Sequence, residues 1–142
     1  MKPHNTEQAA RGLLMYHLAL RGYTIQFTDS RFPMEDLLCI SPNGKHFGID
    51  VKGQRTPNFW RFNEPHKNPE LFFAFVYVPE NDEPRVCIID NATANKLWYQ
   101  YRDDTWQRND IKLIKRKPDS YQWGINWKTA LEYENNYDVL PI

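Results

Sequence analysis

The sequence DLLCISPNGKHFGIDVK, residues 36–52, holds two apolar runs that flank a short polar turn. The turn carries Pro42, Asn43 and Gly44 in the order that favours a type I turn followed by a left-handed glycine. That order predicts a β-hairpin with a three-residue loop and a bulge at Gly44. The length of this loop decides which side chains of the two strands face each other.

The predicted loop sets the pairing between the two strands. Ser41 then faces Lys45, and Asp36 lies directly across from Asp50. The alternative is a two-residue Asn-Gly turn, which would set Asp36 opposite Val51. That register would draw a proline without an N–H into the ladder, so we favour the first one.

Asp50 and Lys52 stand two positions apart in the second strand, so their side chains share one face of the sheet. Two carboxylates that face each other repel unless positive charge lies between them. Oxygen ligands on neighbouring strands suit a hard divalent cation, Mg²⁺ above all, with Mn²⁺ as a substitute. Lys52 would orient or deprotonate a water at such a site. The alternative is an exposed ion pair that contributes under about 1 kcal/mol.

The rest of the chain predicts helices and strands that pack around the hairpin. Helices are expected over residues 5–22, 92–101 and 126–136, and strands over residues 23–27, 71–78 and 85–90. Asn5 or Thr6 would cap the first helix, and Asp90 or Asn91 the second. The strand from residue 71 is continuously apolar, as expected of a strand buried on both faces. This order predicts an α/β (α+β) fold, a central mixed β-sheet flanked by helices.

Length and composition limit the classes of protein that fit. The chain of 142 residues predicts one domain, with a core at about 5–100 and a C-terminal extension at about 101–142. The formal net charge is zero, so nucleic-acid binding would need a local basic patch. The two cysteines lack metal-site spacing, and no apolar run approaches membrane-spanning length. We therefore expect a soluble cytoplasmic protein that does not act at a membrane.

The acidic pair and the lysine resemble the active-site motif of a known family. The dipeptide ED at 35–36, followed after the hairpin by DVK at 50–52, resembles the PD-(D/E)-x-K motif of the restriction-endonuclease-like nucleases. The likeness covers about residues 5–100 and is closest to small Holliday-junction-resolvase-like members. It implies a restriction-endonuclease-like core in which Asp36 and Asp50 bind the metal and Lys52 is the catalytic lysine.

The resemblance implies two further site residues. Glu7 lies in the first helix, where related proteins often carry an acidic residue that supports the metal site, and Gln54 lies where they often place a polar residue. Glu7 shares the side of the helix that carries Ala10 and Leu14, which should face the sheet. The alternatives are a carboxylate favoured by the helix dipole and a glutamine at the start of a loop.

Basic residues near the site are candidates for nucleic-acid contacts. They are Arg55, Arg61 and Lys67 in the loop after the hairpin, and Lys112, Lys115, Arg116 and Lys117 in a denser cluster. Phe59 and Trp60 lie among the first three, and this mixture suits a phosphate backbone with a splayed base. The alternatives are aromatic rings folded back on the core and a basic strand edge kept from aggregating.

These observations predict a Mg²⁺-dependent nuclease, in particular a DNA endonuclease, with RNA as the alternative substrate. Cutting both strands of a duplex with one site per chain would favour a homodimer. The rival interpretation is a non-catalytic domain on a nuclease-like scaffold that binds nucleic acid or another protein. Metal binding by Asp36 and Asp50 would separate the two.

Overall fold

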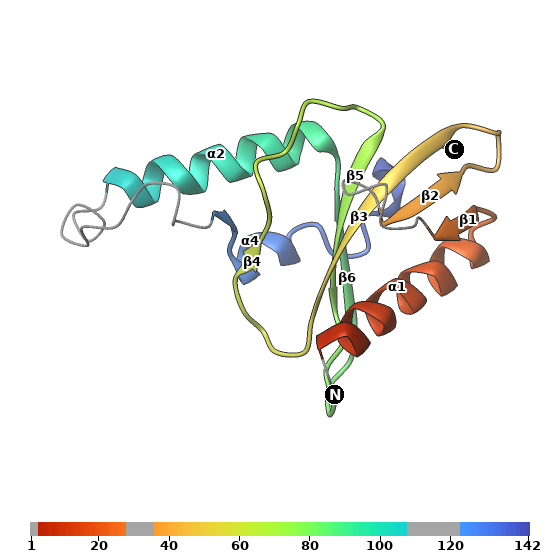
Figure 1. Ribbon diagram of the computed structural model, residues 1–142, viewed down its shortest axis with the longest axis horizontal. Helices are drawn as coiled ribbons and strands as arrows, with labels where there is room; N and C mark the ends of the chain where they lie inside the picture. The colour runs from red at the N-terminus through yellow and green to blue at the C-terminus, as the bar shows by residue number, and fades with distance from the viewer. Residues whose placement is uncertain (1–2, 28–35, 108–122) are drawn as a thin grey trace.

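The computed structural model describes residues 3–27, 36–107 and 123–142. Its main element is a five-stranded sheet in the order β1-β2-β3-β5-β6 (Figure 1). The elements of this sheet and its two long helices are α1 (Pro3–Leu20), β1 (Thr24–Phe27), β2 (Leu37–Ile40), β3 (His46–Gln54), β5 (Leu71–Tyr77), β6 (Arg85–Ile89) and α2 (Asn91–Gln107). The pair β3–β5 is parallel and the other pairs are antiparallel. The predicted α+β class, with a mixed sheet flanked by helices, is confirmed.

Shorter elements complete the described chain. They are the two-stranded sheet of β4 (Trp60–Arg61) and β7 (Gly124–Ile125), the helix α4 (Trp127–Leu131) and the 3₁₀ helix η2 (Tyr137–Val139). Strand β4 lies within the stretch between β3 and β5 that the sequence presents as one long loop. In the described part of the chain, no helix is both long and apolar enough to cross a membrane.

The hairpin of β2 and β3 has the predicted register. Leu37 pairs with Ile49 and Ile40 with His46, as a three-residue loop requires. Ser41 N–H donates to Lys45 O at 2.8 Å, which closes the loop. Gly44 has a φ of 86°, in the left-handed region where a glycine is favoured. The two-residue alternative is therefore wrong.

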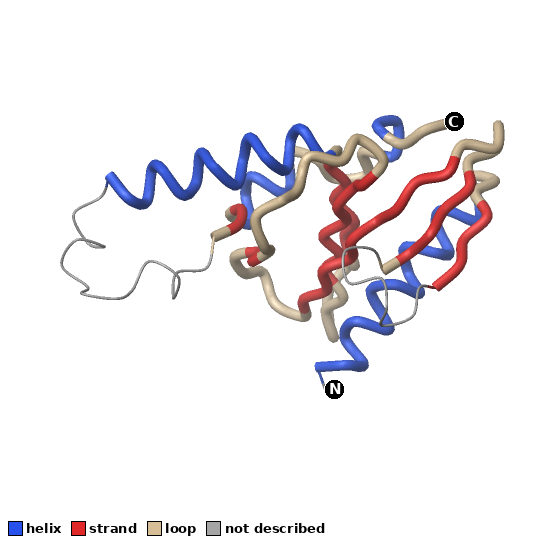
Figure 2. The backbone as a smooth tube through the Cα atoms, turned by 45° about the horizontal axis from the view of Figure 1, so that its top comes forward, coloured by secondary structure: helices blue, strands red, loops and turns tan. Residues whose placement is uncertain are grey.

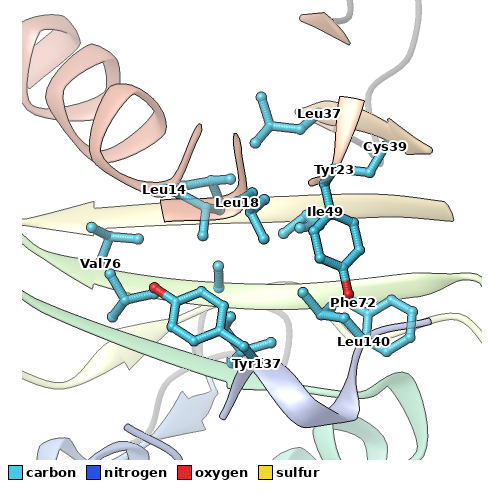
Figure 3. Close-up of a cluster of buried hydrophobic side chains, with 14 of the residues drawn as sticks. Leu14, Leu18, Tyr23, Leu37, Cys39, Ile49, Phe72, Val76, Tyr137 and Leu140 are labelled. Carbon is cyan, nitrogen blue, oxygen red and sulfur yellow. The ribbon is translucent and has the colours of Figure 1, made fainter. Parts of the chain in front are cut away.

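One core lies between α1, the sheet and the C-terminal segment. In Figure 3, Leu14 and Leu18 of α1 lie over the sheet beside Ile49, and Tyr137 and Leu140 approach from the C-terminal side. Leu14 and Leu18 are completely buried, because residues four apart share one face of a helix and this face of α1 packs on the sheet. This packing fixes the height of α1 above β3, and so the position of Glu7.

A second core lies on the opposite face of the sheet, under α2. It gathers Trp60, Phe62 and Trp98 over Phe73 and Phe75 of β5. Residues 123–142 contribute to both cores, through β7 and α4 on this face and through η2 on the other. In Figure 2, α1 crosses behind β1, β2 and β3, and no described helix covers the other face of these three strands.

The start of α1 differs from the prediction, and the start of α2 agrees with it. The helix α1 begins at Pro3, so Asn5 and Thr6 lie inside it and the predicted cap is wrong. Proline suits the first turn of a helix, where its missing N–H would have no helical partner. For α2, Thr93 N–H donates to Asp90 Oδ1 at 2.7 Å, which confirms Asp90 as a cap.

Candidate active site

The candidate site lies where β2 ends and β3 continues. Asp36 is the last described residue before β2, and its N–H donates to Ile49 O at 2.9 Å. Its Oδ2 accepts the N–H of Val51 at 2.7 Å. In a longer hairpin the Val51 N–H would donate to a backbone carbonyl of β2. Here the Asp36 carboxylate accepts that hydrogen bond instead. The ladder ends one pair before the predicted pair, and the Asp36 side chain reaches the edge of β3 beside Asp50.

Glu7 occupies the next position along the same edge. Its Oε1 accepts the N–H of Gly53 at 3.3 Å, which confirms that Glu7 faces the sheet. A Cβ added to Gly53 would lie 2.8 Å from the Ala10 Cβ and 3.2 Å from Thr6 O. The missing side chain therefore lets α1 approach β3 closely enough for the Glu7 carboxylate to reach the site.

Asp50 and Lys52 share one face, as predicted. Lys52 Nζ lies 3.1 Å from Asp50 Oδ1, and 16% of the Asp50 side chain and 35% of the Lys52 side chain are exposed. Lys52 is thus the cation that faces the buried Asp50 Oδ1. Burial raises the pKa of the Asp50 carboxyl; the Lys52 charge opposes that rise, and Asp36 and Glu7 add to it.

The same balance acts on Glu7. Burial raises its pKa, the hydrogen bond from Gly53 lowers it, and the negative charge of Asp36 raises it again. Lys52 and Arg11 each lower it. The three carboxylates thus lie close enough to repel one another, and two cations offset three anions in the described site.

Arg11 is a site residue that sequence reasoning missed. Its Nη1 lies 3.7 Å from Asp36 Oδ1, and its Nε is buried without a hydrogen-bond partner in the described chain. The signal was its spacing, because residues four apart lie on the same side of a helix and Arg11 follows Glu7 by four. That spacing became informative only once Glu7 was placed against the end of β2.

The donor set fits a hard cation. A Mg²⁺ site in proteins commonly uses one or two carboxylates and completes its shell with water and substrate oxygens. The buried Asp50 Oδ1 already faces the Lys52 ammonium at 3.1 Å, so a metal ion at this oxygen would have to share or displace that partner. Across the described ranges, no three Asp, Glu, His or Cys side chains converge closely enough to hold a metal ion. Asp36, Asp50 and Glu7 are the carboxylates of the described site that could contribute to a metal shell completed by water.

A groove opens beside Lys52. Its volume is about 550 Å³, and its lining comes from the first turns of α1 and from the chain between β3 and β4. The lining residues are Thr6, Glu7, Lys52, Gly53, Gln54, Arg55, Thr56, Asn58, Phe59, Trp60 and Arg61. Gln54 faces this groove and donates from Nε2 to Phe59 O at 2.7 Å, which holds the chain after β3 in place.

The structure separates the predicted nucleic-acid contacts. Arg55 and Arg61 line the groove with Lys52, and Arg55 Nη2 also lies 3.1 Å from Glu80 Oε1. Lys67 lines a different cavity, beside the start of α2. The four basic residues Lys112, Lys115, Arg116 and Lys117 lie outside the described residues.

The aromatic residues of this segment divide in the same way. Trp60 is 1% exposed and belongs to the second core, so the expectation that it meets a substrate base is wrong. Phe59 stays at the margin of the groove, half-buried, and its ring packs on Tyr101 with centroids 4.7 Å apart. Of the two rings, only Phe59 is placed for contact with a bound molecule.

No family model, curated protein or solved structure matches this chain. The class that the chain itself defines is an α+β protein with a mixed sheet and an acidic site at the end of a hairpin. The likeness to the PD-(D/E)-x-K nucleases, including a restriction-endonuclease-like core, stays a prediction. Any function for the protein therefore depends on the chemistry of the site.

Proposed function

We propose that the protein is a Mg²⁺-dependent nuclease that hydrolyses phosphodiester bonds, in particular a DNA endonuclease. One observation carries this proposal. Asp36, Asp50 and Glu7 reach one end of the hairpin from three segments of the chain, with the Lys52 ammonium 3.1 Å from Asp50. Carboxylates with an adjacent lysine form a site that suits a divalent cation and a phosphate group.

Each residue has a role that follows from its position. Asp36 and Asp50 would hold the Mg²⁺, which when bound supplies Lewis-acid stabilisation of the negative charge on the phosphate. Lys52 stabilises the charge that develops on the phosphate oxygens and orients the attacking water. Glu7 holds the edge of β3 through Gly53 N–H and so positions the strand that carries the other two. Gln54 positions the groove wall beside them.

A second candidate is a non-catalytic domain that binds nucleic acid. One observation favours it: Asp36 and Asp50 each have a cation nearby, Arg11 at 3.7 Å and Lys52 at 3.1 Å. Such internal partners would compete with a metal ion. Isothermal titration with Mg²⁺ and Mn²⁺ separates the candidates. The nuclease proposal expects saturable binding in the wild type that is lost in the Asp50→Asn variant, and a scaffold expects no binding in either.

The decisive experiment is a cleavage assay on plasmid, linear duplex, single-stranded and branched DNA, and on RNA, with Mg²⁺ and with EDTA. We expect cleavage with Mg²⁺ and none with EDTA. The Asp36→Asn and Asp50→Asn variants should lose the activity, because each keeps the shape of the side chain and removes the charge that a cation requires. Cleavage that persists in EDTA or in both variants contradicts the proposal.

A further inference from the structure

The groove beside Lys52 has the size of a site for one small group. Its volume of about 550 Å³ lies within the range of roughly 300–1,000 Å³ that is typical of pockets for a single small ligand. Its walls come from the Thr6–Glu7 turn of α1 on one side and the chain around Asn58 and Phe59 on the other. A space of this volume has room for about one nucleotide.

Unpartnered polar atoms concentrate at this groove. Buried polar groups without a hydrogen bond are rare in proteins, and each calls for an explanation. The described residues hold six such side-chain atoms, in Arg11, Asp50, Gln54, Arg55, Trp60 and Tyr137. Three of these residues line the groove, and two more belong to the adjacent acidic site.

The chemistry of these atoms is mixed. Gln54 Oε1 is an acceptor and Arg55 Nε is a donor, whereas the donor Trp60 Nε1 belongs to the second core and is not counted here. A nucleobase with its edge exposed offers both donors and acceptors, and a phosphate offers acceptors alone. The mixture therefore suits a nucleotide whose base is not engaged in a base pair.

Charge and an aromatic ring favour the same occupant. The groove lining contains Lys52, Arg55 and Arg61 and the carboxylate of Glu7, and Lys52 and Arg55 also lie near Asp50 and Glu80 just outside the lining. Phe59 presents a ring that its packing on Tyr101 holds in place. A basic groove with a fixed aromatic ring is the usual site for single-stranded nucleic acid, in which bases stack on the ring and phosphates meet the cations.

We propose that this groove binds one unpaired nucleotide next to the scissile phosphate, so that the preferred substrate carries a single-stranded segment at the cleavage position. The position beside the scissile phosphate rests on the proposed nuclease function, whereas the binding of an unpaired nucleotide does not. The substrate class is then a single strand, a flap or a fork, and an uninterrupted duplex is a poor substrate.

Binding and cleavage are measured separately to test this. Fluorescence anisotropy in EDTA compares three labelled DNAs: a single strand, a duplex with a single-stranded tail and a blunt duplex. We expect the first two to bind at least roughly tenfold more tightly than the third, because base stacking on an aromatic ring adds affinity that a paired base cannot supply. Cleavage in Mg²⁺ should follow the same order.

Two variants and a matched control locate the binding. Phe59→Ala should weaken single-strand binding by roughly 5- to 100-fold. Arg61→Gln should weaken it and lower the slope of log affinity against log salt by about one. Lys96→Gln removes the same charge from an exposed position on α2 and should change neither. Arg61 is exposed, so its variant keeps the test valid if Phe59→Ala unfolds the protein.

The outcomes are distinct. Equal affinity for blunt and tailed duplexes, or full single-strand affinity in Arg61→Gln, overturns the groove assignment even if the protein cleaves DNA. A preference for single strands without any cleavage in Mg²⁺ supports the groove assignment and rejects the nuclease proposal.

Discussion

Strands β3 and β5 run parallel and side by side, yet their rows of side chains differ completely on one face. Asp50 pairs with Phe73, and Lys52 with Phe75. The two β5 residues, Phe73 and Phe75, are apolar and buried in the second core, and Phe75 is 0% exposed. On β3 the same rows carry a carboxylate and an ammonium. The covering layer of α2, α4 and the small sheet is built over β5, and β3 lies beside it.

The difference shows that the position of β3 in the sheet does not require polar side chains at Asp50 and Lys52. The strand β3 is the central one of five, where an apolar side chain would be expected to pack well. Buried ion pairs are often replaced by apolar residues with no loss of stability. A charged pair at the centre of a sheet therefore has no evident structural advantage, and the proposed site would account for it.

Among the substitutions that test this difference between β3 and β5, Lys52→Met should have the largest effect on the cleavage rate. Removing a group that assists proton transfer or stabilises charge should lower the cleavage rate by about 10²–10⁴-fold. The protein should still fold, with a lower melting temperature, because the half-buried lysine is the cation that faces the buried Asp50 carboxylate. Lys45→Met is the control, since Lys45 is exposed in the hairpin loop at the other end of β3. A Lys52→Met protein that cleaves like the control would contradict the role of Lys52.

The converse substitution on β5 is Phe75→Ala. Phe75 packs between Trp60 and Phe62, with ring centroids 5.4 and 5.5 Å away. Its loss should reduce the free energy of unfolding by about 3–5 kcal/mol, because a buried ring leaves a cavity. The cleavage rate of the folded fraction should change little. Urea denaturation measures the first quantity, and a loss below about 1 kcal/mol would mean that the second core is loosely packed.

The hairpin register could be predicted from the sequence because turn chemistry is local. The order of Pro42, Asn43 and Gly44 admits few conformations, and the register follows from the loop length. The exact end of β2 was not predictable in this way. The sequence is equally consistent with Asp36 as the last paired residue of β2 and with Asp36 as a side chain that accepts a hydrogen bond in place of a further pair. The structure shows the second arrangement.

The positions of Arg11 in the first helix and Trp60 in the segment after the hairpin were not predicted from the sequence, and the physical reason is the same for both. Arg11 and Trp60 owe their roles to packing between segments far apart in the chain. Trp60 belongs to β4, whose partner β7 lies more than sixty residues further on, so no local pattern indicates its burial. The role of Arg11 likewise cannot be inferred from the helix alone, because it depends on Asp36 at the end of β2.

A smaller effect is expected at the contact that brings α1 to the site. In Gly53→Ala, the new Cβ would meet the Ala10 Cβ at 2.8 Å, so α1 must shift. We expect a loss of about 1–3 kcal/mol in the free energy of unfolding, together with a loss of activity as Glu7 moves. Gly12→Ala is the matched control, because nothing lies within 4 Å of its added Cβ. That variant should be stabilised by roughly 0.5–1 kcal/mol. Equal behaviour of the two would exclude a close approach of α1 to β3.

The smallest effect concerns the charge of Glu7. Burial, reinforced by Asp36, raises the pKa of Glu7 in the folded protein above its ordinary value of 4.5. As the pH rises above 4.5, the unfolded chain releases this proton first, so the free energy of unfolding falls until the folded pKa is passed. Glu7→Gln keeps an oxygen acceptor for Gly53 N–H and removes the titration. The variant should match the wild type at pH 4 and be slightly more stable at pH 7, as urea denaturation at both values would show. A variant that is less stable than the wild type at pH 7 would mean that the Glu7 charge supports the fold, and the contrast between β3 and β5 would then have a structural cause as well as a functional one.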